Sequence, residues 1–126
     1  MRRGFRKSNG KITTHLLDTA RGMPIEDIKV ELFKVVASEQ KKFLASSVTN
    51  GDGRCPGPLL VGENVVVGRY EIVFHLGKYM KSTHLQSNIP LFLDDIPIRF
   101  GVNNSNSHYH IPLLVSPYGY STYRGS

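Results

Sequence analysis

Three histidines could provide acid–base catalysis or bind a metal ion. His15 lies in an alternating stretch near the N-terminus, and His108 and His110 are two residues apart in a second one. Side chains of a strand alternate between its faces, so His108 and His110 share a face. An imidazole titrates near neutral pH and serves as general base, general acid or metal ligand. A lone strand histidine is more commonly a hydrogen-bonded surface residue, and we interpret His75 and His84 in that way.

Arg54 follows directly on an Asn-Gly-Asp-Gly sequence, which is a strong turn signal. A guanidinium held by such a turn can bind an anion or a polarised carbonyl through paired hydrogen bonds. From its spacing alone, a solvent-facing loop charge is the simpler interpretation. Polar groups also gather at the end of the given sequence, in Tyr123, Arg124 and Ser126, although chain ends are usually solvated.

Metal and covalent chemistry are the weaker interpretations of these residues. No Cys, Asp or Glu accompanies the histidines on their strand faces, and Arg54 would repel a cation. Cys55 has no evident base beside it, and Ser116 and Ser126 lack the glycine-flanked turn of a nucleophile elbow. We therefore expect no metal and no cofactor.

The segments that must position these residues are short and rich in β-forming side chains. Turns of Gly, Pro and Asn separate them, and residues 77–88 fit either a short helix or a loop. Seven or eight short strands with at most one short helix predict an all-β protein built as a two-sheet β-sandwich. The predicted strands cover residues 12–18, 28–36, 43–49, 59–61, 65–76, 90–100, 108–116 and 120–123.

The strand over residues 108–116 shows how core and binding surface would divide. Its histidine face continues through Pro112 and Leu114. The opposite face is apolar, which is typical of a sheet with one side in the core and the other available for binding. That apolar face consists of Tyr109, Ile111, Leu113 and Val115.

Charge and composition exclude several classes of protein. Residues 1–11 hold five basic and no acidic side chains, whereas residues 12–126 hold eleven basic and ten acidic ones. We predict a disordered basic leader over 1–11 and a single domain over 12–126. The domain itself is nearly neutral and no apolar run approaches about 20 residues, so we expect neither a nucleic-acid nor a membrane partner. With one cysteine, a reducing compartment is expected, the cytoplasm first and the peroxisome as the alternative.

Three parts of the chain carry a resemblance to a known family. They are THLLDTARG at residues 14–22, DGRC at 52–55, and HYHIPLL with YSTYRGS over 108–114 and 120–126. Together they resemble the 5-hydroxyisourate hydrolases, transthyretin-related enzymes of urate breakdown, and the resemblance spans residues 12–126. The closing Tyr-Arg-Gly-Ser distinguishes these hydrolases from the hormone carrier transthyretin.

The resemblance implies a transthyretin-like sandwich assembled as a homotetramer, a dimer of dimers, with active sites in the channel between dimers. It implies a metal-free hydrolysis of 5-hydroxyisourate to 2-oxo-4-hydroxy-4-carboxy-5-ureidoimidazoline. His15, Arg54 and His110 would be the catalytic residues, and His15, Arg54, Tyr123 and Ser126 would contact the substrate. His108 would have a peripheral role.

Elementary chemistry adds a mechanism and leaves alternatives open. Hydrolysis of an amide-like ring carbonyl needs a positioned water, a base near neutral pH and a positive group for the developing oxyanion. Either His15 or His110 would take the proton from water, and Arg54 would hold the substrate's polar edge. A non-catalytic carrier of small planar or aromatic ligands is the leading alternative, and an interaction module is the third.

Overall fold

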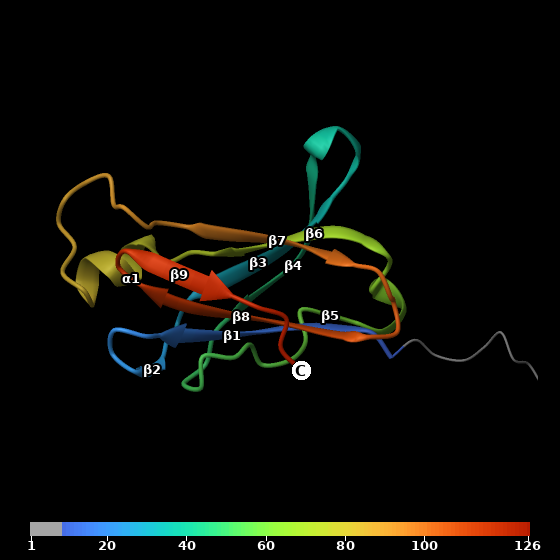
Figure 1. Cartoon of the computed structure of the whole chain (residues 1–126), viewed down its shortest axis with the longest axis horizontal. Helices are drawn as coiled ribbons and strands as arrows, with labels where there is room; N and C mark the ends of the chain where they lie inside the picture. The colour runs from blue at the N-terminus through green and yellow to red at the C-terminus, as the bar shows by residue number, and fades with distance from the viewer. Residues whose placement is uncertain (1–8) are drawn as a thin grey trace, which may run out of the picture.

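The computed structural model describes residues 9–126, which form two β-sheets packed against each other (Figure 1). One sheet has the strand order β2-β1-β8-β9 with β5 also paired to β1, and the other has the order β4-β3-β6-β7. The strands of the first sheet are β1 (Lys11–Asp18), β2 (Met23–Pro24), β5 (Leu60–Val61), β8 (His108–Ser116) and β9 (Gly119–Thr122). Those of the second are β3 (Lys29–Val35), β4 (Lys41–Val48), β6 (Gly68–Phe74) and β7 (Ile96–Val102).

The core lies between the inner faces of the two sheets. Alternate side chains of β1 and β8 point inward and meet those of β3 and β6, as the two-residue period requires. Each fully buried aliphatic or aromatic side chain contributes about 1.5–3 kcal/mol. The buried set includes Ile12, Leu16, Tyr109, Ile111, Leu113 and Val115 of the first sheet and Val30, Leu32, Tyr70, Ile72 and Phe74 of the second.

The pairing of β1 with β8 is parallel, whereas the other strand pairs are antiparallel. In its register Lys11 lies opposite His108, Thr13 opposite His110 and His15 opposite Pro112. The outward face of these two strands therefore gathers basic and hydroxyl side chains from both ends of the domain.

The predicted sandwich is confirmed, and most of its strands overlap the predicted segments. β2 was not predicted, and β4 begins at Lys41 and not at residue 43. β6 begins at Gly68 and not near residue 65, because the Tyr70 hydroxyl bonds both the N–H and the C=O of Val66 (3.0 and 2.6 Å) and removes them from the ladder. β7 begins at Ile96, after a loop that includes Pro90, which has no N–H to donate to a sheet.

The segment left open as helix or loop contains α1 (Gly77–Ser82) followed by a loop. Leu76 and Met80 are both buried and one helical turn apart, and the Met80 N–H donates to the Leu76 carbonyl at 3.0 Å. This apolar pair anchors the helix on the core. Two short 3₁₀ turns, Ala37–Glu39 and Gly62–Asn64, complete the elements of the described residues.

The predicted basic leader falls largely on residues 1–8, which lie outside the described residues. Its last residue, Lys11, is the first residue of β1. Within residues 9–126 no helix has the length and apolar character that a membrane span requires.

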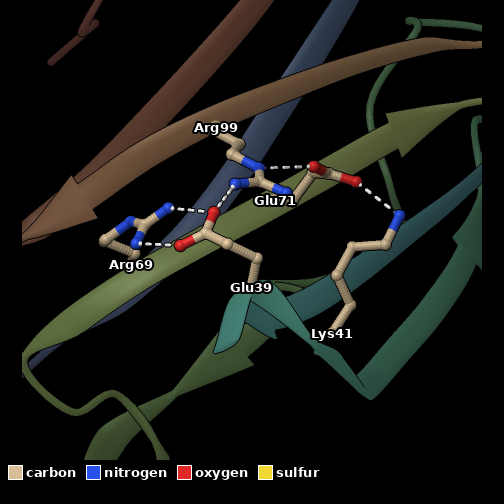
Figure 2. Close-up of polar contacts among 5 residues, drawn as sticks. All are labelled: Glu39, Lys41, Arg69, Glu71 and Arg99. Carbon is tan, nitrogen blue, oxygen red and sulfur yellow. Dashed lines mark hydrogen bonds and ion pairs between the residues drawn. The ribbon is translucent and has the colours of Figure 1, made fainter. Parts of the chain in front are cut away.

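A charged cluster on the second sheet ties three strands and a turn together (Figure 2). Glu71 is buried and accepts hydrogen bonds from Arg99 Nε at 2.9 Å and Lys41 Nζ at 2.8 Å. Glu39 accepts both guanidinium nitrogens of Arg69 at 2.9 Å and Nη1 of Arg99 at 2.6 Å. Arg69, and then Arg99, lower the pKa of Glu39 to about 2.

Replacing Glu71 by Gln should lower the free energy of unfolding by about 1–3 kcal/mol at neutral pH, because it leaves two cations without their buried anion. Burial raises the pKa of Glu71, but the hydrogen bonds from Arg99 and Lys41 lower it overall. A lowered carboxyl pKa stabilises the fold above its unfolded pKa and loses that effect as pH falls. The difference between parent and variant should therefore shrink toward acidic pH in urea denaturation at fixed protein concentration. An equal loss in Glu39→Gln, which removes an exposed carboxylate in place of a buried one, would contradict this account.

Candidate active site

The turn that carries Arg54 is held together by its own first residue. The Asn50 side-chain oxygen accepts the N–H groups of Asp52 at 2.9 Å and Arg54 at 3.2 Å. The Asn50 N–H donates to the Arg54 carbonyl at 2.8 Å, and the Gly53 N–H donates to the Asn50 carbonyl at 2.9 Å. All of these bonds lie within residues 50–54, so the local sequence is enough to predict the shape of the turn.

Gly53 fixes this turn against β1. Its φ is +75°, and a Cβ there would overlap the carbonyl oxygen of Leu16. The Leu16 N–H donates to the Gly53 carbonyl at 2.8 Å, and His15 and Arg54 form an isolated antiparallel bridge. Only glycine satisfies both the left-handed backbone and the close approach. The structure thus brings Arg54 next to His15.

His15 is tied to the same turn through its ring. Its Nε2 lies 2.8 Å from the Asp52 carbonyl oxygen, and because a carbonyl only accepts, this nitrogen carries a proton. The distal nitrogen of His15 is thus occupied in supporting the turn that carries Arg54.

His110 is held on two sides. Its Nδ1 lies 2.8 Å from the Thr13 hydroxyl, and the Gly125 N–H donates to its carbonyl at 2.7 Å. A Cβ on Gly125 would come within 2.6 Å of the ring carbon Cδ2, so the glycine of the closing Tyr-Arg-Gly-Ser lets the chain pass directly against the imidazole. This contact also places the neighbouring Ser126.

The pKa of His110 is lowered. Burial is the largest cause, and the positive charge of Arg54, followed by those of His108 and His15 when protonated, adds to it. Each of these removes stability from the imidazolium form. His110 is therefore neutral, with a lone pair on one nitrogen, at pH values where an unperturbed histidine is partly charged.

These residues surround a cavity of about 370 Å³ on the outer side of the first sheet. Three of the predicted residues, Arg54, His110 and Ser126, line it directly, and His15 adjoins it through Arg54. The full lining is Lys11, Thr13, Thr14, Arg54, Cys55, Gly57, Pro58, His108, His110 and Ser126.

Tyr123 is not brought together with the others within one chain. It lines a second, more apolar cavity of about 230 Å³ with Arg124 and residues of β7 and β8. There the guanidinium of Arg124 lies 4.2 Å from the centre of the Tyr109 ring, and its Nη2 donates to the His108 carbonyl at 3.3 Å. The substrate contact predicted for Tyr123 stays a prediction.

Lys11 and Thr13 are cavity residues that were not among the predicted site residues, and Cys55, considered only as a weak nucleophile, also lines the cavity. A signal existed for the first two, because Lys11 and Thr13 share the outward strand face with His15 at two-residue spacing. What the sequence did not show is that β8 lies beside that face in parallel register.

The cavity is electropositive, with Lys11 and Arg54 beside two imidazoles and no carboxylate side chain in its wall. Such a wall suits an electron-rich or anionic small molecule. Among residues 9–126, no three His, Cys, Asp or Glu side chains are gathered closely enough to hold a metal ion.

The two histidines interpreted as structural do bond elsewhere. His75 Nε2 lies 2.6 Å from a Glu31 carboxylate oxygen and its Nδ1 lies 3.1 Å from Asp95. His84 Nε2 lies 2.6 Å from a carboxylate oxygen of the buried Asp18, and its ring contacts Tyr79 of α1. Both partner sets lie outside the cavity.

Comparison with known proteins gives a consistent result. Residues 12–125 match the sequence model of the HIUase/Transthyretin family. A protein of Rhizobium meliloti (strain 1021), 5-hydroxyisourate hydrolase 2, is 47% identical over 118 residues, which is 94% of this chain and 98% of the relative. The 5-hydroxyisourate hydrolase of Pseudomonas aeruginosa is 48% identical over 117 residues, 93% of this chain and 92% of the relative.

Two solved structures share the fold. An (S)-allantoin synthase superposes with a TM-score of 0.87 at 44% identity over 94% of this chain, which spans 44% of that longer chain. The Klebsiella pneumoniae 5-hydroxyisourate hydrolase superposes with a TM-score of 0.75 at 30% identity, over 93% of this chain and 99% of that one.

Gly53→Ala should destabilise the protein by about 1–3 kcal/mol, because an alanine there is strained in its backbone and overlaps Leu16. Gly51→Ala is the matched control in the same turn, since a Cβ at Gly51 meets nothing within 4 Å. Its effect should stay within about 0.5 kcal/mol. Thermal denaturation of both variants measures this, and equal melting temperatures would contradict the assigned role of Gly53.

Arg54→Ala should raise the pKa of His110 toward its ordinary value, because it removes the neighbouring positive charge that disfavours the imidazolium. An NMR titration of the histidine ring protons measures the shift. Arg21→Ala is the control, since the Arg21 guanidinium bonds Tyr79 and is not among the charges that act on His110. An unchanged His110 midpoint in Arg54→Ala would show that the two groups are not coupled.

Proposed function

The chain belongs to the HIUase/transthyretin family, and from this membership we infer that it hydrolyses 5-hydroxyisourate to 2-oxo-4-hydroxy-4-carboxy-5-ureidoimidazoline without metal or cofactor. The expectation of an enzyme, drawn from the sequence, is confirmed by these relatives. The observation that carries the proposed activity is near-half identity, over almost the whole chain, to proteins named 5-hydroxyisourate hydrolase.

In this proposal His110 is the general base. Its lowered pKa keeps it neutral, and its Nδ1 bonds Thr13, which leaves Nε2 without a partner among the described residues. His15 is the poorer candidate, because its distal nitrogen donates to the Asp52 carbonyl. His15 would act by holding the turn of Arg54 and orienting water or substrate.

The reaction would proceed by addition of water and loss of the ring bond. His110 Nε2 takes a proton as the water oxygen bonds to the ring carbonyl carbon, and the carbonyl oxygen becomes an oxyanion. Arg54 stabilises that charge, which is where electrostatic catalysis is usually largest. The oxyanion then collapses, the ring carbon–nitrogen bond breaks, and the leaving nitrogen receives a proton.

The substrate's fit follows from the cavity wall. A flat purine-derived ring with several carbonyl oxygens would meet the Arg54 guanidinium and the Lys11 ammonium, and no Asp or Glu side chain in the lining competes for them. Ser126 lines the same cavity and would close it over the bound ring.

We keep the homotetramer, a dimer of dimers, as part of the proposal. Residues on an isologous interface occur in symmetric copies, so the outward faces of β1 and β8 from two chains would meet around the channel. In that arrangement Tyr123 would complete a site through assembly. The cytoplasm stays the proposed location.

His110→Ala and Arg54→Ala should each lower kcat/KM by an amount that corresponds to a loss of about 2–4 kcal/mol of transition-state stabilisation. His15→Ala should also lower kcat/KM, because the turn that carries Arg54 loses its hydrogen bond to the His15 ring. His75→Ala, outside the cavity, is the control and should keep parent activity. The measurement is the ring-opening rate on fresh 5-hydroxyisourate, corrected for its spontaneous decay. In the parent, kcat/KM should fall as pH drops through the lowered pKa of His110.

Intact assembly of each variant has to accompany these rates. Near-parent kcat/KM in all three site variants would refute the residue assignment. Stoichiometric binding of a planar ligand without turnover by the parent would favour the carrier alternative instead.

A further inference from the structure

The Thr13 hydroxyl lies between two imidazoles. Its Oγ1 is 2.7 Å from Nε2 of His108 and 2.8 Å from Nδ1 of His110. The arrangement follows from the parallel register of β1 and β8, which sets Thr13 opposite His110 and two residues along from Lys11, the residue opposite His108. The two rings themselves are 6.1 Å apart between centres, too far for a direct hydrogen bond.

A hydroxyl has one proton to donate and lone pairs to accept with, and this limits how the three groups combine. Both bonds can form at once only when Thr13 donates its hydroxyl proton to one neutral imidazole and accepts an N–H from the other. If Thr13 donates to His110 Nδ1, then His110 carries its proton on Nε2 and is no base. If Thr13 donates to His108 Nε2, then His110 carries its proton on Nδ1 and its Nε2 has a free lone pair.

We propose that Thr13 is a positioning residue whose hydroxyl holds His110 in the Nδ1–H tautomer and links its protonation to that of His108. The catalytic role of Thr13 depends on the proposed hydrolase function. The tautomer itself is a property of the resting protein.

The link also provides a path for the proton taken from water. When Nε2 of His110 gains a proton, the Nδ1 proton can move to the Thr13 oxygen as the hydroxyl proton moves to Nε2 of His108. The positive charge thereby passes from the half-buried His110 to the exposed His108, which releases a proton to solvent.

The same path run backwards restores the base. His110 then gives its Nε2 proton to the leaving ring nitrogen, takes one on Nδ1 from Thr13, and Thr13 takes one from His108, which recovers a proton from solvent. Over the cycle, one proton leaves to solvent and one returns, so neither histidine nor the hydroxyl is changed.

The surroundings favour this direction of charge movement. The charges that act on His110 are those of Arg54 in the turn after β4, His108 of β8 and His15 of β1, and Lys11 and the Cys55 thiol line the same cavity. Burial is the largest cause of the lowered pKa of His110, and these three basic groups add to it. Burial also raises the pKa of the Cys55 thiol, so Cys55 supplies no compensating negative charge. An imidazolium at His110 is therefore disfavoured, and moving its extra proton through Thr13 places the positive charge on the exposed His108 instead.

Thr13→Val tests the proposal, because valine keeps the shape and β-propensity of threonine and removes only the hydroxyl. Thr13→Ser restores the hydroxyl and should rescue the variant. Thr14→Val is the matched control, since the Thr14 hydroxyl donates to the Ile111 carbonyl and not to an imidazole. Thr13→Ala serves in place of valine if the latter does not fold.

The first readout is ¹⁵N NMR of histidine-labelled protein above its titration range, which distinguishes the two ring nitrogens without any substrate. Parent, Thr13→Ser and Thr14→Val should show His110 protonated on Nδ1, and Thr13→Val should show it largely on Nε2. Retention of the Nδ1–H form in Thr13→Val, or an Nε2–H form in the parent, would overturn the proposal.

The second readout is turnover. Thr13→Val should lose about 10- to 100-fold in kcat with little change in KM and a displaced acid limb of the pH profile, while Thr13→Ser stays within about threefold of the parent. Parent-like kcat in Thr13→Val would overturn the relay. If the parent itself does not turn over 5-hydroxyisourate, the proposed function fails, and the NMR result still decides the role of Thr13 in the tautomer.

Discussion

The parallel pairing of β1 with β8 is the constraint on which the site depends. It joins two strands that are nearly a whole domain apart in sequence and sets Thr13 beside His110. Since side chains alternate along a strand, a slip of one residue would turn the imidazoles inward and the core residues outward. The buried residues on the inner faces of both strands oppose such a slip, because moving them to solvent would cost several kcal/mol. The same packing that builds the core therefore holds the register of the outward polar groups.

Two glycines then bring loops onto this strand pair. Gly53 lets the Arg54 turn lie against Leu16, and Gly125 lets the closing segment lie against the His110 ring. In both places a side chain on the glycine would hold the two segments apart. The Tyr-Arg-Gly-Ser ending thus shapes the site partly through Gly125, because only a residue without a side chain can lie this close to the His110 ring. The polar residues of the ending do not suggest this role.

Charge is arranged differently on the two sheets. On the second sheet, Glu39 and Glu71 neutralise Arg69, Arg99 and Lys41 through direct hydrogen bonds, which joins neighbouring elements (Figure 2). In the cavity on the first sheet, cations and imidazoles face one another with no Asp or Glu side chain in the wall. Repulsion among these groups is a cost to folding. Together with burial, which is the larger cause, it lowers the pKa of His110, and it leaves the cations free to bind an electron-rich ligand.

Local patterns in the sequence determined much of the molecule. Two-residue alternation predicted which face of residues 108–116 is buried, and the Asn-Gly-Asp-Gly turn predicted the support for Arg54, because both depend on neighbours a few residues apart. The resemblance of short motifs pointed to the family and to His15, Arg54 and His110. Tertiary structure alone decided that Thr13 joins His108 to His110, that Lys11 reaches the cavity, and that Tyr123 lies in a different one. These facts depend on which strands become neighbours and in which register, and long-range pairing leaves no periodic trace in either strand taken by itself.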